Sequence, residues 1–110
     1  MKTVVFGYSE NAERYSNKAY HLLKEYKHDA IAFNPRTDDI NSINYPFDTL
    51  TMYVGESISE KFSDQILQLN FKRIIFNPGS ENEILEKKCL EKNIEVVHGC
   101  TLVMLRTNQY

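Results

Sequence analysis

The chain has 110 residues, the size of one ordinary domain, and its formal net charge is −2. Hydrophobic residues make up 42% and charged residues 25%, which is the balance of a soluble globular protein. Lys and Arg are scattered, which argues against nucleic-acid binding, and apolar runs of about five residues are too short for a membrane span. We expect one domain over residues 1–110 that binds a small molecule, with a homo-oligomer left open.

The cysteines and the first residues of the chain indicate in which cellular compartment the protein works. Cys89 and Cys100 are the only two cysteines, and neither lies in a CxxC or zinc-type spacing. Residues 1–7 are strand-like and lack the apolar core and cleavage site of a signal peptide. The sequence therefore predicts a reduced, cytoplasmic protein.

Strand-like and helix-like segments alternate from the start of the chain. Lys2 to Phe6 is a β-branched and aromatic run that ends at Gly7. Residues 17–27 carry apolar side chains at helical spacing, and residues 30–33 form a second short strand. Asn34-Pro35 ends this strand, because proline cannot continue a ladder of hydrogen bonds.

The middle of the chain predicts a strand of a different kind. Thr49 to Val54 alternates Thr and Tyr with apolar residues, which is typical of an edge strand with one wetter face. Ser57 and Glu60 have the spacing of a capping box. The helix behind them would carry one apolar stripe, formed by Ile58, Phe62, Ile66 and Leu69.

The last third continues the alternation. Residues 73–76 and 94–98 are predicted strands, and residues 101–105 a short sixth one. Glu81 to Lys92 is a predicted helix with acids early and lysines late, which suits its dipole, and Asn93 follows where a left-handed residue closes a helix. Together the segments predict an α/β fold: a Rossmann-like, doubly wound parallel sheet of about five strands with helices on both faces, in three layers. We expect the strand order 3-2-1-4-5, with the polar third strand at an edge.

In such sheets a ligand binds at the carboxyl ends of the strands, where the strand order reverses. The expected order places this point between the first and fourth strands, beside the loops at 7–16 and 77–79. The first loop delivers Ser16, Asn17 and Lys18 at a helix start, where free N–H groups and the helix dipole favour a phosphate.

The glycine and acid pattern of a NAD site is absent. Gly7 has no second or third glycine behind it, so the GxGxxG fingerprint is missing. The second strand ends in Asn34-Pro35-Arg36, where a NAD domain has an Asp or Glu for the ribose hydroxyls. Arg36 suits a phosphate on the ribose, as in NADP or coenzyme A (CoA).

Five segments resemble motifs of the small bacterial CoA-binding proteins, over nearly the whole chain. They are Gly7-Tyr8-Ser9, Arg14-Tyr15-Ser16, Phe33-Asn34-Pro35, Phe76-Asn77-Pro78-Gly79 and Val97-His98-Gly99-Cys100. The resemblance implies a Rossmann-type fold related to the CoA-binding domain of ADP- or GDP-forming acyl-CoA synthetases. The candidate cofactor-binding residues are Gly7, Tyr8, Ser9, Ser16, Asn17, Lys18, Asn34, Pro35, Arg36, Asn77, Pro78 and Gly79.

The resemblance also implies roles for some of these residues. Gly7, Ser9 and Lys18 would hold the pyrophosphate of CoA, and the segment from Asn34 to Arg36 would border its adenosine end. The chain departs from the family at three places. Lys27 stands where the family usually has a glycine, Asn77 where it tends to have Gln, and His98-Gly99 where it tends to have Asp-Arg.

The leading hypothesis is a stand-alone CoA- or acyl-CoA-binding protein without chemistry of its own. We find no catalytic constellation and no metal-ligand spacing among the histidines. Cys100 and His98 lie two residues apart, which could suggest a Cys–His nucleophile. A cysteine is more often a buried core residue than a nucleophile, so we expect Cys100 to be structural. Two alternatives stay open: an NADP-binding or acyl-transferring enzyme, and a regulatory domain with a vestigial nucleotide crevice.

Overall fold

The computed structural model describes residues 1–110 and has five strands, all parallel, in one sheet of order β2-β1-β3-β4-β5. The strands are β1 (Lys2–Phe6), β2 (Asp29–Phe33), β3 (Thr49–Met52), β4 (Arg73–Phe76) and β5 (Glu95–His98). The helices are α1 (Tyr15–Glu25), the 3-10 helix η1 (Ile40–Ser42), α2 (Glu56–Lys61), α3 (Ser63–Gln68), α4 (Glu83–Glu91) and α5 (Thr101–Arg106). The Rossmann-like α/β fold predicted from the sequence is confirmed.

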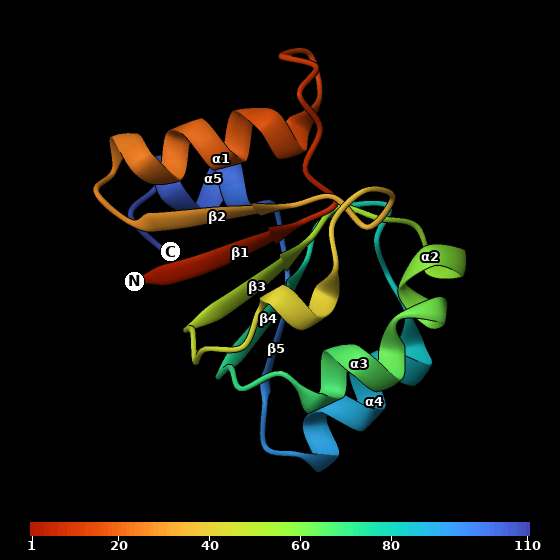
Figure 1. Cartoon of the computed structure of the whole chain (residues 1–110). Coiled ribbons are helices and arrows are strands. Elements are labelled where there is room, and N and C mark those ends of the chain that lie inside the picture. The colour runs from red at the N-terminus through yellow and green to blue at the C-terminus, as the bar shows by residue number, and fades with distance from the viewer.

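The sheet lies between two helical layers (Figure 1). Helices α1 and α5 cover one face, and α2, α3 and α4 cover the other. Alternate residues of β1 supply both cores: Val4 and Phe6 belong to the large cluster beneath α2–α4, and Val5 to the small cluster beneath α1 and α5. None of the helices combines the length and apolar character needed to cross a membrane.

The predicted strand order is wrong at one point, because β3 is central. It pairs with β1 on one side and β4 on the other, and both Thr49 and Thr51 are fully buried. Their hydroxyls find partners inside the protein: Arg73 Nε donates to Thr49 Oγ1 over 3.1 Å, and Thr51 Oγ1 lies 2.7 Å from Thr101 Oγ1. A polar face can thus be buried when its hydrogen bonds are satisfied.

Two other predicted elements differ. Residues 101–105 form a helix, not a sixth strand; Thr101, Leu102 and Leu105 are its buried residues, at helical spacing. The predicted helix after β3 is divided at Phe62 into α2 and α3. It begins after Gly55 without a side-chain cap, so the Ser57–Glu60 capping box does not form.

The chain leaves α1 through a residue with left-handed backbone geometry. Lys27 has φ 68°, and it occupies the position where the sequence resemblance expects glycine. A side chain with a Cβ is strained there, whereas glycine is not. Asn93 fulfils the same role after α4, with φ 62°, as the sequence predicted.

We expect Lys27→Gly to stabilise the free protein by about 0.5–1 kcal/mol, since relief of left-handed strain exceeds the extra entropy that glycine gives the unfolded chain. Urea unfolding measures this difference. Lys24→Gly is the matched control, because Lys24 lies within α1 and glycine there costs about 1 kcal/mol. A loss of stability in both variants would contradict the strain at Lys27.

Candidate functional site

The strand order reverses between β1 and β3, so the crevice lies beside Gly7 and the segment after β3. Gly7 has φ 105°, and a Cβ built on it would lie 2.7 Å from Val54 Cγ1 and 3.0 Å from the Tyr53 carbonyl carbon. Its N–H and that of Tyr8 both donate to Phe33 O, over 2.8 and 2.9 Å. Because Gly7 has no side chain, the carboxyl ends of β1, β2 and β3 can lie close together, and a side chain there would separate β1 from the segment after β3.

The sequence prediction placed this crevice between the first and fourth strands and missed the segment Tyr53-Val54-Gly55. The error follows from the strand order, because β3 occupies the place expected for the fourth strand. One signal was available: Gly55 directly follows a predicted strand, as Gly7 does.

Helix α1 begins at the crevice, and its first turn does not compensate its dipole. Arg14 is the N-cap residue and makes no side-chain capping bond, and the first turn contains no acid. Lys18 lies just inside the helix, exposed, with Nζ 5.7 Å from the centre of the Tyr15 ring. An uncapped helix start with two basic residues is unfavourable by itself and favourable for a bound anion.

Ser16 and Asn17, predicted as ligand contacts, direct their side chains into the β1–α1 loop. Ser16 Oγ accepts a hydrogen bond from Ser9 N over 3.1 Å. Asn17 Nδ2 donates to Ser9 O over 3.0 Å and to Tyr8 OH over 3.3 Å. The loop that the sequence assigned to the pyrophosphate is therefore held by the first turn of the helix behind it.

The turn after β2 presents Arg36 to solvent. Asn34 Oδ1 accepts a hydrogen bond from Arg36 N over 2.9 Å, and Asp38 Oδ2 accepts one from Asn34 N over 2.8 Å. Pro35 is part of this turn. The Arg36 side chain makes no hydrogen bond or ion pair, and it is exposed, so it is available to a phosphate.

Asn77 differs from the other predicted contacts because its side chain lies inside the protein. Its Nδ2 donates to Thr51 Oγ1 over 2.7 Å and to Met52 O over 2.8 Å, while its Oδ1 accepts from Thr101 N over 2.9 Å. It thereby joins β3, β4 and the start of α5. Pro78 and Gly79, which follow it, are exposed.

The Tyr53 hydroxyl is the only buried side-chain polar atom without a well-formed hydrogen bond, and the hydroxyls of Thr101 and Thr51 interact with it only weakly. Burial raises the pKa of this phenol far above its ordinary value, so the hydroxyl stays protonated. An unsatisfied buried hydroxyl costs about 1–3 kcal/mol.

We therefore expect Tyr53→Phe to be more stable than the wild type, by about 1 kcal/mol, because it removes the poorly paired hydroxyl and keeps the ring. The midpoint of urea unfolding should rise with an unchanged m-value. A drop in the midpoint would show that the hydroxyl is hydrogen-bonded in solution.

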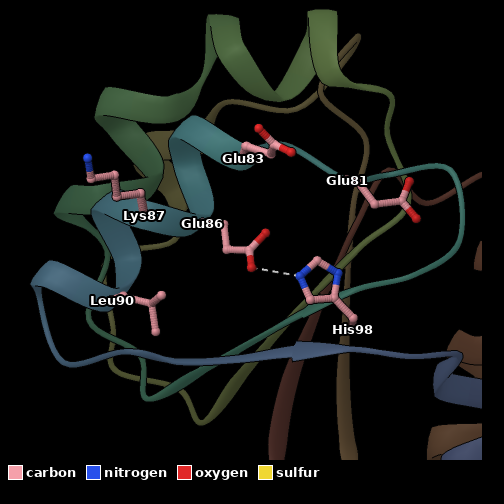
Figure 2. A pocket seen from close by; sticks show the side chains of 6 residues that line it. All are labelled: Glu81, Glu83, Glu86, Lys87, Leu90 and His98. Carbon is pink, nitrogen blue, oxygen red and sulfur yellow. Dashed lines mark hydrogen bonds and ion pairs between the residues drawn. The ribbon is translucent and has the colours of Figure 1, made fainter.

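A surface hollow lies between α4 and the end of β5 (Figure 2). It is lined by Glu81, Glu83, Glu86, Lys87, Leu90 and His98. None of these is a predicted site residue. His98 Nε2 lies 2.8 Å from Glu86 Oε1, and its ring stacks on Phe76, so His98 is not paired with Cys100.

The cysteines are both free. Burial raises the pKa of the Cys89 thiol to about 11, which makes it a poor nucleophile. No group of three or more His, Cys, Asp or Glu side chains is arranged to hold a metal ion.

Comparison with known families decides what kind of domain carries this crevice. The model of a CoA binding domain matches residues 1–106. The chain belongs to this CoA-binding domain family. The sequence resemblance is thereby confirmed, and the family indicates CoA as the ligand.

Solved structures share the fold of this chain. The crystal structure of an uncharacterized protein is 36% identical and has a TM-score of 0.88; the match covers 99% of this chain and 97% of that one. A protein from Thermus thermophilus is 19% identical, with a TM-score of 0.86 and coverage of 99% and 90%. Prb, a protein redesigned for binding, is 17% identical, with a TM-score of 0.83 and coverage of 99% and 84%. Comparison with curated proteins gave no match.

Proposed function

We propose that this chain is a stand-alone CoA- or acyl-CoA-binding protein that performs no chemistry of its own. The pyrophosphate of CoA lies against the β1–α1 loop and the start of α1. The adenosine lies over the end of β2, with its 3′-phosphate at Arg36.

The observation that carries this proposal is the start of α1. It combines an absent cap, an absent acid and two basic residues, Arg14 and Lys18, at the point where the strand order reverses. Each of these features destabilises an empty helix start slightly and favours an anion there. The family match to a CoA binding domain gives the anion its identity.

Arg36 supports CoA over NAD. NAD has free ribose hydroxyls, which Rossmann domains bind with an acid after the second strand. Here the nearest acid, Asp38, accepts a hydrogen bond from Asn34 N and is used within the turn. A guanidinium at this position suits the phosphate that CoA carries on its ribose.

The proposed absence of chemistry is supported by the state of the nucleophiles. Cys89 is buried and His98 is paired with Glu86. Cys100 is half-buried and has no histidine bonded to it. Neither thiol has a base within hydrogen-bond reach, so neither is activated in the manner of a Cys–His pair.

A thermal-shift comparison of CoA, acetyl-CoA, NADP, NAD and ATP tests the proposal. A ligand at 100 times its Kd adds about 2.7 kcal/mol of stability, which for this size of domain is roughly 10 °C in Tm. We expect CoA and acetyl-CoA to give the largest shifts. An equal or larger shift with NAD would overturn the CoA assignment, and a larger shift with NADP would favour the NADP-binding alternative.

The same samples test for chemistry. Acetyl-CoA incubated with the protein should release free thiol no faster than a blank without protein. Thioester turnover that disappears in Cys100→Ser would contradict a purely binding role and support the acyl-transferring alternative.

A further inference from the structure

We infer that Ser16 and Asn17 are positioning residues, which set the affinity for CoA by clamping the two peptide groups that flank Ser9 and do not contact the ligand. This inference rests on the proposed function for its ligand, but the clamp itself belongs to the free protein. The hydrogen bonds of the first turn of α1 carry it.

Both sides of Ser9 are held by consecutive residues of one helix turn. Its N–H donates to Ser16 Oγ over 3.1 Å, and its carbonyl accepts from Asn17 Nδ2 over 3.0 Å. Ser9 Oγ in turn accepts from Asn11 N over 3.1 Å, which extends the order one step along the loop. A residue whose two flanking peptide groups are both hydrogen-bonded has little backbone freedom left.

The two clamping side chains are buried, with exposed fractions of 4% for Ser16 and 6% for Asn17. Because both side chains are buried and hydrogen-bonded to the loop, little of either is open to a pyrophosphate that arrives from solvent. Asn17 Nδ2 is further fixed by Tyr8 OH at 3.3 Å, and the Tyr8 ring packs edge-on against Tyr20, 5.0 Å between centres. The clamp is therefore anchored to the helix body.

This arrangement matters for binding because the loop is long for a strand-to-helix connection and lies mostly at the surface. A loop ordered before the ligand arrives does not lose that conformational entropy on binding. Ser16 and Asn17 thus contribute to affinity through the loop, which distinguishes them from Lys18 and Arg36, whose charges meet the ligand directly.

The experiment compares Ser16→Ala, Asn17→Ala and the double variant by calorimetry with CoA, and by amide hydrogen exchange without it. Releasing about one residue of backbone should weaken CoA binding roughly five- to thirtyfold in each single variant. The double variant should bind CoA no more than about threefold more weakly than the weaker-binding single variant, since the loss of either hydrogen bond already frees Ser9. Thr49→Val is the matched control, because it removes the hydroxyl that accepts a part-buried hydrogen bond from Arg73 Nε at the amino end of the sheet.

In the free protein the Ser9 amide should exchange at least about tenfold faster in each variant, while amides of β1 and β4 keep their protection. Two results would overturn the inference: losses of affinity that multiply in the double variant, as for two separate ligand contacts, or unchanged exchange at Ser9. Amide hydrogen exchange at Ser9 tests the clamp even if the wild type does not bind CoA. A failure of the proposed function is therefore distinguished from a failure of this inference. Alanine is a good helix former, so α1 should persist in both variants.

Discussion

Lys18→Glu should weaken CoA binding about 30-fold or more at low salt while making the free protein more stable. The substitution places a negative charge beside the pyrophosphate and removes a positive one, a change of about 2–3 kcal/mol at the effective dielectric of a protein surface. The same glutamate compensates the positive end of the α1 dipole, which has no acid at present, and adds about 0.3–1 kcal/mol. Calorimetry with CoA and urea unfolding without it measure the two effects.

Lys24→Glu is the matched control on the same helix, because Lys24 lies in its last turn. There a glutamate opposes the dipole, so the free protein should lose stability and CoA binding should hardly change. The affinity difference for Lys18→Glu should shrink as salt rises, since exposed charges are screened. If CoA binds Lys18→Glu as tightly as the wild type, the pyrophosphate does not lie at the start of α1.

Arg36→Ala should weaken CoA binding roughly 5- to 100-fold at moderate salt and leave dephospho-CoA binding nearly unchanged. Two side chains hold the turn in which Arg36 lies: Asn34 Oδ1 accepts from Arg36 N, and Asp38 Oδ2 accepts from Asn34 N. The backbone is therefore fixed while the guanidinium is exposed. A guanidinium can meet a phosphate with two parallel hydrogen bonds, and only CoA carries the 3′-phosphate.

The measurement is a calorimetric comparison of both proteins with both ligands. We expect the substitution to weaken the affinity for CoA much more than the affinity for dephospho-CoA. Equal losses for CoA and dephospho-CoA would mean that Arg36 does not bind the 3′-phosphate, and the preference for CoA would then have to arise elsewhere in the crevice.

The two predictions depend on features that local sequence reveals well. The sequence shows a strand that ends at Gly7, a long loop after it, and a helix with Lys18 in its first turn. So is the replacement of an acid by Arg36 after the second strand. Strand–helix alternation with short connections implies a parallel sheet, because parallel strands need a crossover between them.

The direction of the Ser16 and Asn17 side chains was not visible in the sequence. Residues of this kind at a helix start bind a phosphate, cap the helix or bond a neighbouring loop equally well. Only the path of the loop, which returns Ser9 to the first turn of α1, selects the third role. Asn77 is a similar case, because its amide could face a ligand or the interior, and the nearby Thr51 and Thr101 draw it inward.

The sequence by itself determined the α/β class and most strands, since these follow from the periodicity and type of neighbouring residues. The tertiary structure alone decided that β3 is central, that residues 101–106 are helical, and that the crevice opens between β1 and β3. Alternation of Thr with apolar residues indicates that one face of the strand is polar, but it does not indicate whether that face is exposed to solvent. Thr49 and Thr51 are buried because Arg73, Thr101 and Asn77, all distant in the chain, supply their hydrogen bonds.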